Sequence, residues 1–234
     1  MSHLRLRPMR SLDFAQVANI AYQTGYFGDP AQIFFPDPAL FGDLWIGPYL
    51  HKSGLERGTL GLVAVQVGAE GSAEILGYIV GMTYPAQYQQ ALSSEVVRVL
   101  GKLATGRYPR WRGCVAYLAR ALFYPGPHLD GGAYPAHLHL NLLPQARGQG
   151  LGGRLLDSYL GVLRLGGIRG VQLSTTLENR SALALYQKRG FMVRAQRISN
   201  LWQPWLGRPV TRVAMGLNLG ALPDSGSQPF QPHG

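Results

Sequence analysis

A glycine-rich turn constrains the fold of this chain more than any other feature. The segment 145–152 reads QARGQGLG and lies between an alternating apolar run at 136–143 and a helical pattern at 151–165. Gly148 and Gly150 have no Cβ atom, so the backbone can curl and point successive N–H groups at one anion. The positive N-terminal end of the following helix would attract the same anion. The sequence therefore predicts a strand–turn–helix unit that binds phosphate.

Periodicity places further strands and helices on both sides of this unit. A two-residue period indicates a strand, and an apolar residue at every third or fourth position indicates a helix. The predicted strands are 3–8, the hairpin 59–67 and 74–84, 136–143, 170–176, one beginning at Phe191, and 210–219. The predicted helical segments are 11–25 with Ser11 as N-cap, a short one beginning near Ala39, 85–127, 151–165 and 180–189. Alternating strands and helices in the second half indicate the α/β (α+β) class.

We expect a single domain over residues 1–221, with the helical region 85–127 as an insertion. A chain of 234 residues is long enough for one large domain with a substantial core. Residues 222–234 are rich in Pro, Ser, Gln and Gly and have little to bury, so we expect a flexible tail. Aromatic residues in and near the insertion could bind an acceptor, but internal packing is the expectation.

The glycine turn has other interpretations. It is not a Walker A loop, because no Gly-Lys-Ser/Thr follows it, but Gly148, Gly150 and Gly153 match the dinucleotide spacing G-x-G-x-x-G. A dinucleotide-binding fold would place a continuous apolar strand before the turn, whereas 136–143 carries His137 and other polar residues at alternate positions. The glycines could also make a tight turn without any ligand. The context, not the turn alone, favours phosphate binding.

A second motif follows the turn in the same half of the chain. Asn179 can cap a helix, and Gly190 can reverse the chain into the strand that begins at Phe191. The order Asn179, Ala182, Leu185, Tyr186, Gly190, Phe191 resembles the second cofactor motif of the GNAT acetyltransferase superfamily. The turn resembles the first motif of that family, Gln/Arg-x-x-Gly-x-Gly/Ala, through Gln145, Gly148 and Gly150.

This resemblance implies a mixed, mostly antiparallel, twisted sheet of about six or seven strands, flanked by helices. It also implies an N-acetyltransferase of class EC 2.3.1.- that moves an acetyl group from acetyl-CoA, or another short acyl-CoA, to a primary amine by direct attack in a ternary complex. No metal is implied. The residues that match the cofactor site are Leu142, Leu143, Gln145, Arg147, Gly148, Gln149, Gly150, Leu151, Gly152, Asn179, Ala182 and Tyr186.

Candidate catalytic residues follow from the same resemblance. Helical spacing alone favours Tyr186 as a core aromatic, but the family's equivalent tyrosine can protonate the departing thiolate, which makes Tyr186 the candidate general acid. His139 is the first candidate for the base that deprotonates the amine, with Glu74 and His137 as rivals. Both histidines could instead be structural. A His-x-His pair can also bind zinc, but no third ligand lies nearby in the sequence.

The amino-acid composition limits the classes of ligand and the compartment that we expect for this protein. The chain has 22 Lys and Arg against 12 Asp and Glu, a formal net charge of +10, which favours an anionic ligand. The basic residues are scattered, so nucleic-acid binding is disfavoured. Cys114 is the only cysteine, which excludes an internal disulfide and suits a reducing cytoplasm. We expect a cytoplasmic protein without a signal peptide or membrane partner, because no stretch approaches 18 apolar residues.

Three functions remain open at this point. The first is acetyl transfer to an amine, the second an inactive acyl-CoA-binding sensor or interaction module, and the third nucleic-acid binding. An intact Tyr186 favours the first over the second. The acceptor could be a small amine, an aminoglycoside, a peptide N-terminus or a protein lysine, and the positive charge favours a small metabolite amine or peptide. A homodimer is also left open.

Overall fold

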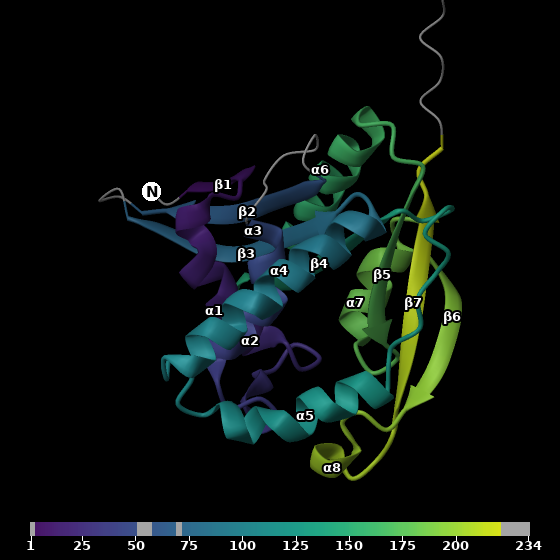
Figure 1. Cartoon of the computed structure of the whole chain (residues 1–234). Coiled ribbons are helices and arrows are strands. Elements are labelled where there is room, and N and C mark those ends of the chain that lie inside the picture. Colours follow the sequence, from purple (N-terminus) through teal and green to yellow (C-terminus); the bar gives the residue numbers. More distant parts are fainter. Residues whose placement is uncertain (1–2, 51–57, 69–71, 221–234) are drawn as a thin grey trace, which may run out of the picture.

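The computed structural model describes residues 3–50, 58–68 and 72–220, and these form a central sheet covered by helices on both faces (Figure 1). The predicted tail 222–234 lies outside the described residues. The seven strands of the described residues are β1 His3–Pro8, β2 Thr59–Val67, β3 Ala73–Met82, β4 Ala136–Leu142, β5 Gly170–Thr176, β6 Met192–Ser199 and β7 Val210–Asn218. Their order is β1-β2-β3-β4-β5-β7-β6.

The pairing confirms the predicted mixed sheet. β4 and β5 are parallel, and the other five neighbouring pairs are antiparallel. This arrangement excludes the dinucleotide-binding fold, whose strands are mostly parallel. The glycine turn therefore lies at the end of a strand in a different architecture from the one that the G-x-G-x-x-G spacing suggests.

The sheet opens between its two parallel strands. Among the described residues, β4 pairs with β5 through Ala136 with Val171 and His137 with Gln172. β4 then stays paired with β3 as far as Leu142, while β5 runs beside β7 to Thr176. Figure 1 shows β5, β7 and β6 turning away from the other four strands. The second half of β4 thus has one edge that no strand covers.

Helices cover the two faces with different cores. The α-helices are α1 Phe14–Thr24, α2 Pro38–Trp45, α3 Gly47–Leu50, α4 Pro85–Ala104, α5 Trp111–Phe123, α6 Leu151–Leu165, α7 Arg180–Gln187 and α8 Gln203–Leu206. One core is rich in aromatic residues and joins α1, α2 and α5 to the sheet. The other is largely aliphatic and holds α6 and α7 against the opposite face. The glycine turn begins α6, so it sits where the second core meets the open edge of β4.

One predicted helix boundary is wrong. Ser11 is not the N-cap of a long helix, because residues Ser11–Asp13 form a 3₁₀ turn and α1 begins at Phe14. The Asp13 carboxylate accepts a hydrogen bond from the Arg10 N–H at 2.7 Å and pairs with the Arg7 guanidinium at 2.6 Å. A charged pair therefore fixes this end of the helix, where a serine hydroxyl was expected to do so.

Within the described ranges, every helix is too short or too polar to cross a membrane.

Candidate active site

The glycine turn has the backbone geometry of an anion-binding loop. Gly148 and Gly150 have φ angles of 74° and 72°, in the left-handed region that favours glycine, and no heavy atom beyond their chain neighbours lies within 4 Å of where their Cβ atoms would be. Gly150 is the N-cap of α6, and the first hydrogen bond of the helix runs from Arg154 N to Gly150 O at 3.1 Å. The N–H groups of residues 151–153 precede that bond and are free to bind an anion.

A groove of about 320 Å³ leads from this turn to Tyr186. We name it the turn groove. It includes these residues of the predicted cofactor set: Leu142, Arg147, Gly148, Gly150, Leu151, Gly152, Asn179, Ala182 and Tyr186. The structure thus brings most of the predicted set together, although the residues come from β4, the turn, α6 and α7.

Leu143, Gln145 and Gln149 do not line the turn groove. The Leu143 N–H donates to Leu76 O at 2.9 Å, and its carbonyl accepts from Ala146 N at 2.9 Å, so both main-chain groups already have a partner within the protein. The Gln149 side chain donates to Gln145 O at 2.8 Å. These three residues flank the turn outside the groove, and their predicted contact with the cofactor stays a prediction.

The loop after α1 forms the opposite wall of the groove, which the sequence did not indicate. Arg147 reaches across to this loop, and its Nη2 donates to Gly28 O at 2.7 Å. Gly28 has a φ of 103°, which brings its carbonyl towards the arginine. Arg147 therefore adds a positive charge beside the turn and ties the loop to it. The loop residues 25–30 read GYFGDP and carry no recognisable motif, so only the tertiary fold reveals this contribution.

Local sequence explains the position of Tyr186. The Asn179 side chain accepts from Ala182 N at 3.2 Å and so caps α7, as the sequence predicts. After the helix, Phe191 N donates to Tyr186 O at 3.1 Å, and Gly190 has a φ of 84°. The Tyr186 ring is buried and packs on Phe191 with 5.6 Å between ring centroids. Burial raises the pKa of the Tyr186 phenol, which keeps it protonated near neutral pH.

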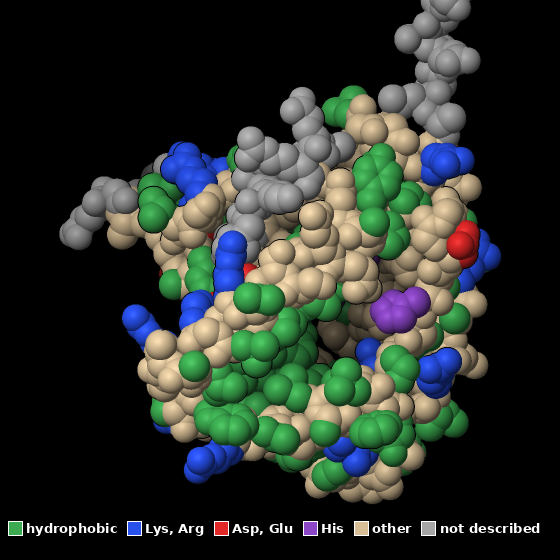
Figure 2. All heavy atoms as spheres, in the orientation of Figure 1, with side chains coloured by type: hydrophobic (Ala, Val, Ile, Leu, Met, Phe, Trp, Pro, Cys, Tyr) green, Lys and Arg blue, Asp and Glu red, His purple; other side chains and the backbone are tan. Residues whose placement is uncertain are grey.

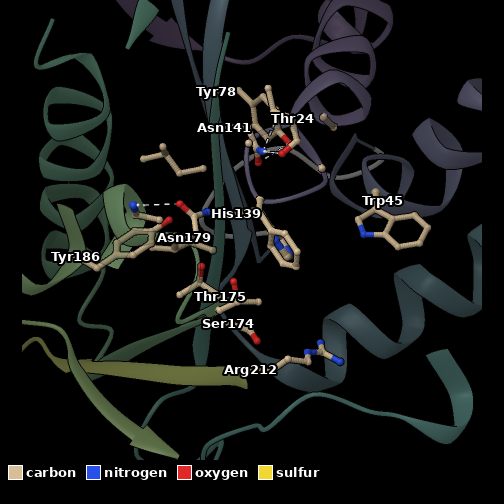
Figure 3. A pocket seen from close by; sticks show the side chains of 18 of the residues that line it. Thr24, Trp45, Tyr78, His139, Asn141, Ser174, Thr175, Asn179, Tyr186 and Arg212 are labelled. Atoms are coloured by element: carbon tan, nitrogen blue, oxygen red, sulfur yellow. Dashed lines mark hydrogen bonds between the residues drawn. The ribbon is translucent and has the colours of Figure 1, made fainter. Parts of the chain in front are cut away.

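A second space, the central cavity, adjoins the turn groove at the opening between β4 and β5. It has a volume of about 260 Å³ and shares Asn141, Asn179 and Tyr186 with the groove. In the view of Figure 3, Tyr186 and Asn179 lie at the left of the cavity, His139 in the middle and Arg212 at the bottom. Tyr186 is therefore placed where the two spaces meet.

The two histidines of β4 have different surroundings. His137 Nε2 lies 2.7 Å from the Tyr49 hydroxyl, and burial with nearby histidine charge lowers its pKa to about 3. His139 lines the central cavity, and within the described residues its ring has no recorded hydrogen-bond partner. Part of the ring is exposed along the central cavity, and desolvation lowers its pKa to about 4. Both rings are unprotonated at neutral pH, but only His139 reaches the central cavity.

Glu74 lies away from these residues. It is exposed near the start of β3, where it pairs with Gln66 of β2, and it lines neither the turn groove nor the central cavity. The structure does not bring it together with Tyr186 and His139. Glu74 was a candidate base because a carboxylate can accept a proton. The local sequence pattern does not show which end of β3 lies beside the opening in the sheet.

A polar network fixes the upper wall of the central cavity. The Asn141 amide donates to Thr24 Oγ1 at 2.7 Å and accepts from the Tyr78 hydroxyl at 3.2 Å. Thr24 in turn donates to Ile20 O at 2.6 Å. Figure 3 shows Tyr78, Asn141 and Thr24 gathered at this wall. The alternation of β4 predicted that Asn141 shares a face with the histidines, but its partners on α1 and β3 could not be foreseen.

The described residues contain no group of three or more His, Cys, Asp or Glu side chains that could hold a metal ion.

The comparisons with known proteins agree with this geometry. Residues 109–191 match the sequence model of the Acetyltransferase (GNAT) family. This range includes β4, the glycine turn, α6, β5 and α7, and therefore both motifs and Tyr186. The matched segment is the one that forms the turn groove and most of the opening beside it.

Solved structures share the fold. The chain is similar to SsHAT with 23% identity over 93% of this chain and 98% of that one, and a TM-score of 0.58. It is similar to Salmonella typhimurium yncA, solved with its cofactor acetyl-CoA, with 18% identity over 95% and 99% of the chains and a TM-score of 0.55. It is also similar to the Escherichia coli ribosomal-protein-S18-alanine N-acetyltransferase, with 14% identity over 95% and 98% and a TM-score of 0.56.

Proposed function

From the GNAT acetyltransferase domain that this chain carries, we propose that it moves an acetyl group from acetyl-CoA to a primary amine by direct attack. The observation that supports this most is the position of Tyr186, which lines both the turn groove and the central cavity. A ligand whose phosphates lie on the glycine turn can extend along the groove to this phenol. An amine in the central cavity meets the other end of that ligand at the same residue.

In this proposal the turn groove holds acetyl-CoA. The pyrophosphate binds the N–H groups that begin α6, helped by the positive helix end and by Arg147. The pantetheine arm runs beside Leu142 and Ala182 towards the opening between β4 and β5. The acetyl-CoA in the structure of yncA supports this choice of cosubstrate. The groove and the central cavity share Tyr186, so the acyl group would lie where the two spaces meet.

The chemical step uses groups of this chain without a covalent enzyme intermediate. The amine nitrogen attacks the thioester carbonyl, a C–N bond forms, and the C–S bond breaks. An N–H on the uncovered edge of β4 stabilises the negative oxygen that develops during the attack. The Tyr186 phenol then gives its proton to the departing thiolate. Holding the amine and thioester in line supplies much of the rate.

His139 is the base in this proposal. Its ring is unprotonated at neutral pH and lines the central cavity, so it can accept the proton that the amine loses. Burial makes it a weak base, but the cavity that weakens it also disfavours an incoming ammonium ion, because desolvation penalises charge. His137 already lies against the Tyr49 hydroxyl, and Glu74 lies elsewhere, so neither replaces it.

A second function, an acyl-CoA-binding sensor without turnover, uses the same groove. It requires the glycine turn but not Tyr186 or His139. The presence of both side chains at the central cavity favours transfer over sensing.

Calorimetric titration with acetyl-CoA and with desulfo-CoA tests the cofactor site. We expect wild type to bind both, and a Gly148→Asp variant to lose binding by at least about tenfold, because the carboxylate repels pyrophosphate inside the groove. Gly167→Asp is the matched control, since Gly167 has a φ of 69°, no atom within 4 Å of its Cβ position, and no place in the groove. Equal weakening in both variants, or no binding by folded wild type, would contradict the site.

A further inference from the structure

A third space reaches the central cavity from another side. This outer cavity has a volume of about 550 Å³ and shares Leu138, His139, Ser174 and Arg212 with the central cavity. It does not share any residue with the turn groove. Figure 2 shows a hollow in this face of the molecule, with a histidine beside it and no acidic side chain at its border. An acceptor can therefore reach His139 without passing along the turn groove.

The central and outer cavities are lined by positive charge and by no negative charge among the described residues. Of the described residues that line them, none is Asp or Glu, and Arg212 lines both. Arg212 lies on β7 between Thr211 and Val213, and Val213 points into the aliphatic core beneath α6 and α7. Because side chains alternate along a strand, Arg212 points to the other face, towards the opening. Figure 3 shows Ser174 and Thr175 between Arg212 and the side of the cavity formed by Asn179 and Tyr186.

The positive charge of the Arg212 guanidinium is only partly balanced by other groups of the protein. Its Nη1 donates to Tyr124 O at 3.0 Å, and its charge lies 5.5 Å from the centre of the Trp202 ring. Among the described residues, no carboxylate forms an ion pair with it. Its register partner on β6 is Arg197, a second positive charge. Desolvation lowers the pKa of Arg212, but a guanidinium stays charged.

We propose that the acceptor is a small amine that carries a carboxylate, such as an amino acid, and that Arg212 binds this carboxylate while the amine faces the thioester. A half-buried cation without a counter-ion is costly, and a guanidinium binds a carboxylate with two parallel hydrogen bonds. The volume of about 260 Å³ fits a small acceptor. A polycationic aminoglycoside or a lysine side chain would bring like charge to Arg212. The inference rests on acetyl transfer in the central cavity as the proposed function.

Paired acceptors test this proposal by kinetics. Thiol release from acetyl-CoA is measured with the L-amino acids and with their carboxamides, which keep the amine and lose the negative charge. We expect kcat/KM to be on the order of 100-fold higher for the carboxylates, and the Arg212→Gln variant to lose most of this preference because its kcat/KM falls far more for carboxylates than for carboxamides. Arg212→Lys should keep part of the preference, because charge remains but the planar fork is lost.

Arg197→Gln is the matched control. Arg197 is exposed, contacts the same loop through Pro125 O at 3.4 Å, and lines neither cavity, so its loss removes one charge without touching the acceptor. We expect wild-type discrimination in this variant. If Arg212→Gln slows carboxylates and carboxamides equally, Arg212 has a structural role only and the proposal is overturned. The proposal is also overturned if wild type does not prefer carboxylates.

A binding measurement separates this proposal from the proposed function. N-acetyl-L-alanine and N-acetyl-L-alaninamide, which resemble a small product with and without the carboxylate, are titrated into wild type and Arg212→Gln by calorimetry. Tighter binding of the carboxylate to wild type alone supports the Arg212 site even if no acetyl-CoA is consumed, in which case only the proposed function fails. Equal affinity for both probes in wild type overturns the Arg212 site, whatever acetyl-CoA does.

Discussion

Tyr186 has a buried ring and a hydroxyl that points towards Asn179 in Figure 3. We expect Tyr186→Phe to lower kcat by about 100-fold, because the departing thiolate loses its proton donor. The Kd for acetyl-CoA should stay near the wild-type value, since the ring keeps its packing. Steady-state kinetics and calorimetry on the same preparation measure both quantities.

The control for this change is Tyr159→Phe. Tyr159 is also fully buried, but its hydroxyl donates to the carbonyl of His137 at 3.2 Å and lines none of the three cavities. Its loss should cost about 1 kcal/mol of stability and leave kcat unchanged. A Tyr186→Phe variant with wild-type kcat would show that another group protonates the thiolate.

Some residues of the candidate site could be predicted from the sequence, and others could not. Gly148, Gly150 and Asn179 were predicted because each meets a local backbone requirement, a positive φ or a helix cap, that the structure confirms. Arg212 was missed, although a charged residue inside an apolar strand is a signal of its own. Periodicity shows that such a residue alternates with core positions, but not that the opposite face of β7 borders a cavity.

At the scale of one element, β4 carries two histidines whose pKa values are lowered by desolvation, so folding should depend on pH. Their folded pKa values of about 3 for His137 and about 4 for His139 lie below 6.5, the usual value of an unfolded chain. Between about pH 6.5 and pH 4 the unfolded state therefore binds more protons than the folded state. The free energy of unfolding must fall as the pH falls through this window.

Urea unfolding at about pH 7, 6 and 5 measures this effect. The loss of stability towards pH 5 should be smaller in a His137→Gln, His139→Gln double variant, because glutamine takes up no proton. The slope with pH is the test, since the substitutions also change the stability at neutral pH. Equal slopes in wild type and the variant would show that the histidines take up protons at the same pH in the folded and unfolded states, which contradicts the lowered pKa values.

Most strands and the longer helices of the second half were predictable to within a few residues, but the short helices α3 and α8 and the arrangement of the elements were not. α6 and β5 have the predicted bounds, 151–165 and 170–176, because their periodicity is regular and glycines mark their ends. The order in which β7 lies between β5 and β6 depends on contacts between distant segments. The opening beside β4 likewise follows from two strands that separate after two paired residues, which no local pattern encodes.

At the scale of the whole molecule, three spaces meet at this opening in the sheet. The turn groove and the central cavity share Tyr186, and the central and outer cavities share His139 and Arg212. The net charge of +10 is spread widely over the chain, and Figure 2 shows separated Lys and Arg side chains on the face in view. The charges that the two proposals use are the few that lie at the opening, Arg147 beside the turn and Arg212 beside the central cavity. The total charge alone could not have located them.

The most direct measurement of acetyl transfer is a single-turnover reaction of the purified protein with acetyl-CoA and a mixture of L-amino acids. Free CoA and N-acetyl products are both quantified, the products by mass spectrometry. We predict equal amounts of CoA and acetylated amine, with no CoA release above the uncatalysed rate when the amines are omitted. Binding of acetyl-CoA with no acetylated amine would contradict transfer and leave the sensor function. Release of CoA without an amine product would instead show that water is the acceptor.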